Sequence, residues 1–263
     1  MDEDPLKAIR AKKEASIVGC MQLLKEKKVE AVFSAGSTGA TLISAITILG
    51  KQKGVIRPAI ASILPNSDSS VILLDSGASL DVKPKILYQF AVMGSKLAEV
   101  LLELDNPRVG LLNNGEEESK GRDLEKSAYK LLSSSNLNFI GNVEGRDFAT
   151  KKVDVFVTDG FTGNVVLKTL EGTAKLQQKL ISDSLSKNLF KPLLPIVKNA
   201  FKPVKDKLNP DKTNASYLLG VDGLVTIGHG SSKQEAIKNG IKYTNNSIQK
   251  DFIGKFSETL NEL

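Results

Sequence analysis

Four short segments combine glycine with hydroxyl, carboxylate or amide side chains, and each follows an apolar stretch. They are residues 34–39, 75–79, 113–118 and 159–164. Glycine lets backbone N–H groups approach a ligand closely, and a helix N-terminus favours negative charge. We therefore expect the first and fourth segments to bind an anion such as phosphate, whereas the glycines and asparagines of the other two are also typical of ordinary turns.

The first segment, Ser34-Ala-Gly-Ser-Thr-Gly39, offers the fullest set of donors. Its candidate phosphate-binding residues are Ser34, Gly36, Ser37, Thr38 and Gly39. The segment is not a P-loop, because it lacks the Gly-Lys-Ser/Thr ending. A capped turn between a strand and a helix explains the same residues equally well.

The segment Asp159-Gly-Phe-Thr-Gly-Asn164 precedes a long helical pattern. Its candidate phosphate-binding residues are Asp159, Gly160, Thr162, Gly163 and Asn164. In the alternative interpretation, Thr162 or Asn164 caps the helix that follows. Lys168, on that helix, is a candidate catalytic residue, unless it is simply solvated.

Two further side chains are candidates for catalysis. Asn113 can donate to an oxyanion without adding charge, although asparagine is also frequent in turns. His229 is the only histidine and lies between glycines, which suits phosphate binding or acid–base work as well as a structural role. One histidine and one cysteine cannot make a typical zinc set, and no dinucleotide fingerprint is present, so we expect no metal and no cofactor.

Strand and helix patterns alternate along the chain and position these segments. Strands are expected at residues 29–33, 59–64, 71–75, 107–112, 139–143, 153–157 and 223–227, and helices at 6–27, 41–49, 85–104, 124–132, 165–186 and 233–249. The pattern predicts a single α/β domain over residues 1–263, with three α/β/α layers and a mostly parallel sheet. Parallel strands end at a common edge, so we expect the loops to meet there.

Composition narrows the class of protein. The chain carries a net charge of +6, no tryptophan and 5% aromatic residues, which favours an anionic partner but not nucleic acid. No apolar run is long enough to span a bilayer and the start is acidic, so we expect a cytoplasmic protein. Cys20 lies in an apolar helical pattern and is expected to be a small core residue.

A basic and apolar insertion is expected near residues 187–214. Its apolar candidates for membrane contact are Leu189, Phe190, Leu193, Leu194, Ile196 and Val197. Lysines interleave with them over residues 187–207, a combination that suits an anionic membrane surface. The alternatives are a helix pair packed in a dimer, or a landing site for an acidic carrier protein.

Several ordered segments together resemble one family, the bacterial phosphate acyltransferases of phospholipid synthesis. They are residues 153–172, 108–117, 138–147, 219–223 and 229–232. The resemblance implies a fold like that of phosphotransacetylases and isopropylmalate dehydrogenases, and a homodimer. It also implies acyl carrier protein as thioester donor, inorganic phosphate as acceptor, acyl phosphate as product, and peripheral association with the inner face of the membrane.

The sequence departs from this family at three places. Ser37 and Ser79 stand where the family usually has asparagine, and the chain begins where the family has an internal segment. We therefore expect that a family N-terminal segment with one active-site loop is missing. Two alternatives follow: a phosphate acyltransferase that uses coenzyme A, and an inactive module that binds membrane or carrier protein.

Overall fold

The computed structural model describes residues 7, 9, 11–66, 69–150, 152–185, 199–200, 202–203 and 215–260. The strands are β1 (Ala31–Ser34), β2 (Ala59–Pro65), β3 (Ser70–Leu74), β4 (Val109–Leu112), β5 (Phe139–Val143), β6 (Val155–Val157), β7 (Ser216–Leu219) and β8 (Leu224–Ile227). The helices are α2 (Ser16–Lys25), α3 (Thr38–Ile48), α4 (Pro84–Leu102), α5 (Asp123–Ser133), α6 (Gly160–Leu185), α9 (Gln234–Gln249) and α10 (Phe252–Leu260), with a 3-10 helix η1 (Gly145–Ala149).

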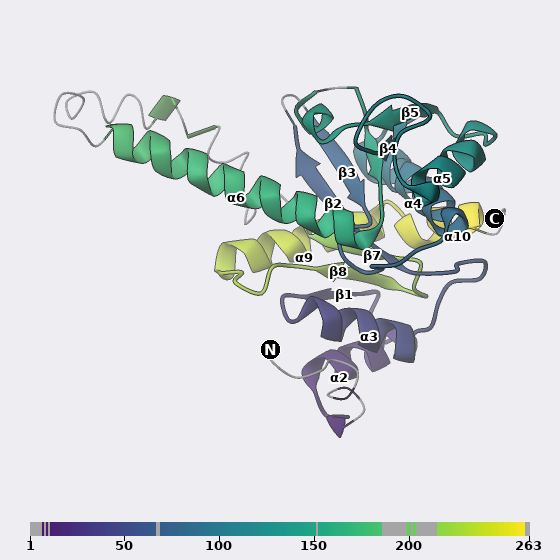
Figure 1. Ribbon diagram of the computed structural model, residues 1–263. Helices are drawn as coiled ribbons and strands as arrows, with labels where there is room; N and C mark the ends of the chain where they lie inside the picture. Colours follow the sequence, from purple (N-terminus) through teal and green to yellow (C-terminus); the bar gives the residue numbers. More distant parts are fainter. Residues whose placement is uncertain are drawn as a thin grey trace.

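The strands form one eight-stranded sheet in the order β1-β8-β7-β2-β3-β6-β4-β5 (Figure 1). Strand pairs β1–β8, β3–β6, β6–β4 and β4–β5 are parallel. Pairs β8–β7, β7–β2 and β2–β3 are antiparallel. The predicted α/β fold with a mostly parallel sheet is confirmed.

The antiparallel strands β7 and β2 at the centre separate two sets of parallel strands that run in opposite directions. Because two neighbours of β2 oppose it, β1 and β8 run opposite to β3, β6, β4 and β5. The loops after β1 and β8 therefore leave one edge, and the loops after β3, β4 and β6 leave the other. The expectation that all these loops meet at one edge is wrong, since it assumed strands that all run the same way.

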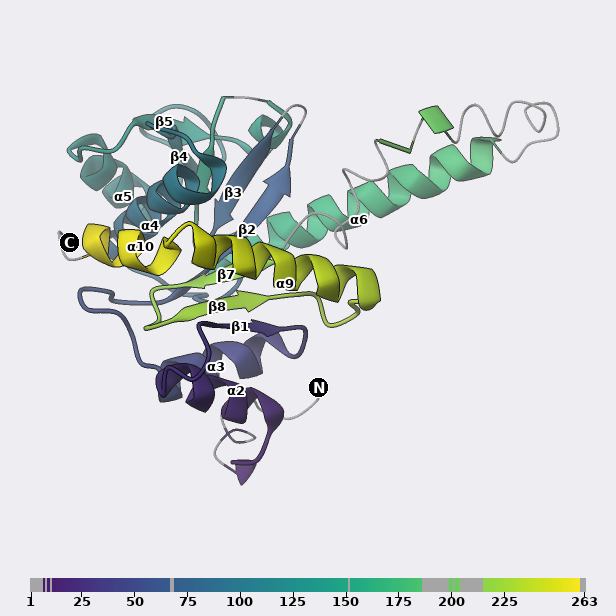
Figure 2. The ribbon, with the colours of Figure 1, turned by 180° about the vertical axis from the view of Figure 1, so that it is seen from behind.

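Helices cover both faces of the sheet. Helices α4, α5, α9 and α10 cover one face (Figure 2). Side chains such as Leu74, Val157 and Leu111 belong to the core on that face. On the other face, α2 and α3 pack over β1, β8 and β7, while Val166 and Leu167 of α6 pack over β3 and β6. Alternate side chains of each strand thus feed two cores, as a sheet between two helical layers requires.

Each strand expected from the sequence is present within two residues of its predicted bounds. Strand β7, of four residues, and helix α10, of nine, were not expected; both are short. Helix α6 begins at Gly160, five residues before its predicted start. Of the helix predicted over residues 6–27, the described residues 7, 9 and 11 are helical, and α2 covers Ser16–Lys25. Cys20 is exposed on α2, whose buried positions are Met21 and Leu24, so its expected place in the core is wrong.

Helix α6 extends well beyond the sheet (Figure 1). Most of the insertion at 187–214 lies outside the described residues, including all six apolar candidates for membrane contact. Among the residues that the structure describes, no helix is both long and apolar enough to cross a bilayer.

Candidate active site

The segment 34–39 forms the turn from β1 into the first turn of α3. The Ser34 hydroxyl lies 2.9 Å from Oγ1 of Thr41, and Thr41 donates to the Ser37 carbonyl at 3.1 Å. Ser37 is the N-cap residue of α3, and its Oγ accepts from the Ala40 N–H at 3.4 Å. The first N–H groups of a helix have no carbonyl partner within it, so the amides of Thr38 and Gly39 are available for an anion.

The segment with His229 lies directly beside this turn. Strands β1 and β8 are parallel neighbours, and the Gly228 N–H donates to the Ser34 carbonyl at 2.8 Å. His229 is exposed, and its Nδ1 lies 2.8 Å from the Ser231 hydroxyl. If Nδ1 accepts from that hydroxyl, the imidazole proton is on Nε2. The structure thus brings together two segments that were predicted separately.

Asp75 holds the loop that follows β3. Its carboxylate is fully buried and accepts backbone N–H groups of Ile60 (3.0 Å), Gly77 (3.1 Å), Ala78 (3.0 Å) and Ser79 (2.7 Å). Burial raises the pKa of Asp75, while these four N–H groups oppose that rise by stabilising the ionised form. The loop is thereby tied to the start of β2.

Asp159 caps α6 and binds Arg122, a residue that was not among the predicted site residues. Its Oδ1 accepts from the Thr162 N–H at 2.8 Å, and its Oδ2 accepts from the Thr162 hydroxyl at 2.9 Å and from Nη2 of Arg122 at 2.6 Å. Burial alone would raise the pKa of Asp159, but the hydrogen bonds from Thr162 and Arg122 outweigh it and lower the pKa. Two predicted phosphate-binding residues are thus bonded to each other at the helix start.

Arg122 also pairs with Glu125, in the first turn of α5, through a very short contact from Nη2. Hydrogen bonds to Glu125 and then Asp159 raise the pKa of the guanidinium above its ordinary value. Arg122 therefore links the starts of α5 and α6, on loops that leave the same edge of the sheet. The available signal was a cation after Lys120-Gly121 with a glutamate three residues later, the position of a capping acid.

Two glycines let α6 pack directly on the Asp75 loop. A Cβ on Gly160 would lie 2.7 Å from Oδ2 of Asp75, and a Cβ on Gly163 would lie 1.9 Å from the Asp75 carbonyl oxygen. Asn164 is exposed and lies beside Gly77. Gly160 and Gly163 therefore allow α6 to approach the Asp75 loop closely. The sequence had suggested a different role for them, contact with phosphate.

Asn113 and Lys168 have partners of their own. The Asn113 amide donates to the Lys120 carbonyl at 3.2 Å, and its Oδ1 accepts from the Asn114 N–H at 2.8 Å. Lys168 pairs with Glu171 at 2.9 Å on the surface of α6. Asn113 follows β4 and lies at the edge opposite to His229, so one chain does not bring these two predicted catalytic residues together.

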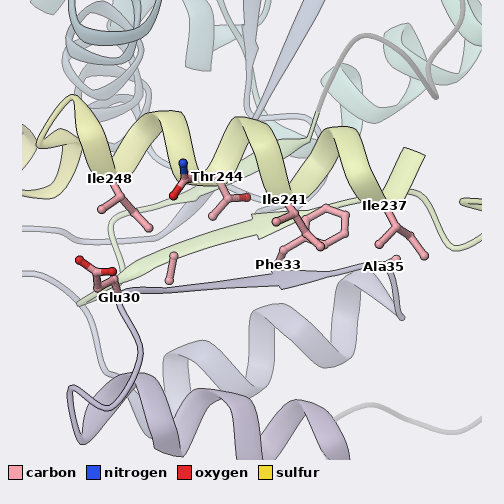
Figure 3. Close-up of a pocket in the computed structure, with 9 residues that line it drawn as sticks. Glu30, Phe33, Ala35, Ile237, Ile241, Thr244 and Ile248 are labelled. Atoms are coloured by element: carbon pink, nitrogen blue, oxygen red, sulfur yellow. The ribbon is translucent and has the colours of Figure 1, made fainter. Parts of the chain in front are cut away.

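An apolar groove of about 550 Å³ lies between β1 and α9 (Figure 3). Phe33 and Ala35 line it from the β1 side, and Ile237, Ile241 and Ile248 line it from α9 (Figure 3). None of the predicted site residues is among those that line it. The polar segments at the starts of α3 and α6 lie instead on the other face of the sheet.

Residues 1–255 match the model of a family described as fatty acid synthesis protein. This chain belongs to that family. A phosphate acyltransferase of Elusimicrobium minutum is 43% identical over 263 residues, which are 100% of this chain and 77% of that protein. A phosphate acyltransferase of Clostridium tetani is 44% identical over 260 residues, which are 98% of this chain and 78% of that protein.

Solved structures share the fold at low sequence identity. A phosphotransacetylase from Streptococcus pyogenes matches with a TM-score of 0.56 at 16% identity, over 88% of this chain and 67% of that one. A branched-chain phosphotransacylase from Enterococcus faecalis V583 matches with a TM-score of 0.56 at 12% identity, over 88% of this chain and 78% of that one. The predicted phosphotransacetylase-like fold is confirmed.

Proposed function

We propose that this chain transfers a fatty acyl group from the thioester of acyl carrier protein to inorganic phosphate, and so supplies acyl phosphate for phospholipid synthesis. The observation that carries the proposal is the match to named phosphate acyltransferases along essentially the whole chain. The phosphotransacetylase fold, and the placement of α3 and α6 on the same face of the sheet, support it.

The acceptor phosphate binds at the start of α3. The amides of Thr38 and Gly39 offer two donors with the favourable end of the helix dipole behind them. Ser34 and Ser37 hold the turn through the hydrogen bonds described above. Gly36, exposed in the same turn, leaves space for a tetrahedral anion.

His229 sets the protonation of that phosphate. Its loop is hydrogen-bonded to the turn at Ser34, and an imidazole nitrogen can accept or donate a proton. A phosphate oxygen attacks the thioester carbonyl, a tetrahedral oxyanion forms, and the carbonyl is restored as the thiolate leaves. A thiol ionises near pH ~8.5, so the leaving group needs little assistance and no covalent acyl-enzyme is required. Positioning and fixed donors supply most of the rate increase.

The start of α6 shapes the other side of the site. Asp159, Gly160, Thr162 and Gly163 fix the helix against the Asp75 loop, which leaves the exposed Asn164 side chain as the direct ligand in this segment. Asn113 as an oxyanion donor and Lys168 as a charge near the thioester remain proposals. Both would have to exchange a present partner for substrate.

Acyl carrier protein is the proposed donor, and a coenzyme A thioester is the alternative. The lysines of residues 187–207 favour an acidic carrier protein. Rates of acyl phosphate formation from the two thioesters, matched in acyl chain and concentration, test this choice. A higher kcat/KM with the carrier protein supports the proposal, and a higher value with coenzyme A replaces it. Carrier binding without turnover by either donor would support the inactive module.

We further propose a homodimer that associates from the cytoplasm with the inner face of the membrane. Leu176 and Leu180 of α6 are more than half exposed, which supports burial against a second copy. The apolar and basic residues of 187–207 support membrane contact. Replacing Leu193 and Leu194 with serine should abolish flotation with anionic vesicles, and unchanged flotation would end the membrane proposal.

A further inference from the structure

Three serine hydroxyls from three separate segments form a chain on the sheet face that carries α3 and α6. Oγ of Ser76, after β3, lies 2.8 Å from Oγ of Ser62 on β2, and Ser62 lies 3.1 Å from Oγ of Ser216 on β7. Ser62 and Ser76 are buried, whereas Ser216, the last hydroxyl of this row, is only half-buried. We propose that Ser216 donates a hydrogen bond to the acceptor phosphate and that Ser62 and Ser76 are the positioning residues behind it. This inference rests on the proposed phosphate acyltransfer.

The register of the sheet places Ser216 near the start of α3. Ser34 of β1 and Ser216 of β7 both pair with Ile227 of β8, so the three lie in one row and their side chains share a face. Strands are spaced by ~4.8 Å, which puts the Cα atoms of Ser34 and Ser216 about 10 Å apart. The first turn of α3 stands over Ser34, since Thr41 bonds its hydroxyl. One tetrahedral anion can therefore contact both the α3 amides and Ser216.

The hydroxyl chain can point its protons in either direction. Ser76 Oγ lies 2.9 Å from the Ile60 carbonyl, so without a ligand Ser76 donates to Ile60, Ser62 to Ser76, and Ser216 to Ser62. Each hydroxyl carries one proton. In the reversed direction Ser76 donates to Ser62, Ser62 donates to Ser216, and the Ser216 proton is free for the anion.

Reversal leaves no buried group without a partner. The Ile60 carbonyl still accepts the Ser76 N–H at 2.9 Å when the Ser76 hydroxyl turns away. A hydrogen bond to a charged acceptor is stronger than one between neutral groups, and it polarises the hydroxyls behind it. The anion itself thus favours the reversed direction, which supplies a neutral donor that does not hold the product by charge.

Asp75 keeps the buried end of the chain in place. Its carboxylate accepts N–H groups from Ile60 on β2 and from Gly77, Ala78 and Ser79 in the loop that carries Ser76. Ser76 and Ser62 therefore belong to one rigid unit. The buried Asp75 loop therefore does more than pack against β2, because it orients the chain of hydroxyls that leads to Ser216.

The test compares Ser216→Ala with Ser216→Thr and with Ser127→Ala, an exposed serine of α5. Calorimetry with inorganic phosphate and the KM for phosphate in acyl phosphate formation are both measured. We expect Ser216→Ala to weaken phosphate binding about tenfold or more, with a smaller change in kcat. Ser216→Thr should retain most of the affinity, because it keeps the hydroxyl, and Ser127→Ala should match the unmodified protein.

Ser62→Ala tests whether the hydroxyl chain behind Ser216 contributes to phosphate binding. It should weaken phosphate binding less than Ser216→Ala does, and the double variant should be no weaker than Ser216→Ala, because the two residues act through one hydroxyl. Equal phosphate affinity in Ser216→Ala and the unmodified protein would overturn the inference, even with turnover intact. Normal phosphate binding that depends on Ser216, without acyl phosphate from any thioester, would instead contradict only the proposed reaction.

Discussion

Gly163 gives the sharpest mutational test of how α6 is positioned. A Cβ at this residue would lie 1.9 Å from the carbonyl oxygen of Asp75 and 2.9 Å from its carbonyl carbon. Backbone atoms cannot rotate away as the end of a side chain can. Gly163→Ala must therefore move α6 and the Asp75 loop apart by about 1 Å before the contact becomes tolerable.

The expected cost follows from that displacement. Overpacking costs ~1–3 kcal/mol, and the better helix propensity of alanine returns ~1 kcal/mol, so we expect a net loss of up to about 2 kcal/mol in the free energy of unfolding. A misplacement of ~1 Å at a catalytic arrangement can lower turnover ~10²-fold. Gly163→Ala should therefore lower turnover proportionally more than it lowers the free energy of unfolding.

Gly172→Ala is the matched control on the same helix. A Cβ there meets nothing within 4 Å, so the change should leave activity intact and stabilise the protein by up to ~1 kcal/mol. Urea unfolding gives the stability of each variant, and acyl phosphate formation gives the turnover. If Gly163→Ala behaves like Gly172→Ala in both measurements, the close packing of α6 on the Asp75 loop is refuted.

Three further predictions concern side chains around the site. Arg122→Ala should lower the free energy of unfolding by about 1 kcal/mol in urea, because it removes the cation that pairs with two carboxylates, while the arginine itself is largely exposed; no change would show that the ion pairs contribute nothing. The pKa of Asp159 is lowered in the folded protein, so its contribution to stability is present above about pH 4 and is lost as pH falls through the folded-state pKa. The difference in unfolding free energy between the unmodified protein and Asp159→Asn should therefore be large at pH 7 and smaller at pH 3. A difference that does not change with pH would contradict this. Asn113→Ala should lower kcat ~10²-fold if the amide serves as an oxyanion donor, and an unchanged rate would remove Asn113 from the reaction.

The order of helices and strands along the chain could be predicted from the sequence, but the relative directions of the strands in the sheet could not. Apolar runs followed by glycine-rich turns located β1, β3, β4 and β6 within two residues. Strand β7 is short and follows the basic insertion, and its antiparallel pairs help to reverse the sheet. No local pattern shows which neighbour a strand will choose. The separation of Asn113 from His229 therefore could not be predicted.

The site shows the same limit at the level of single residues. Asp159 was predicted to bind phosphate because of its place in a glycine-rich loop, yet it bonds Thr162 and an arginine 37 residues earlier in the chain. Such long-range pairs leave no periodic trace. The serine chain was missed for the same reason, since Ser62 and Ser216 are 154 residues apart and neither lies in a motif.

The most direct test of the proposed function is to follow isotopically labelled inorganic phosphate. The protein is incubated with acyl carrier protein thioester and ¹⁸O-labelled phosphate, and the acyl phosphate is analysed intact by mass spectrometry. The proposed function predicts a product that carries the labelled phosphate and forms only when thioester, phosphate and protein are all present. Release of free fatty acid without labelled acyl phosphate, from a folded protein, would contradict it.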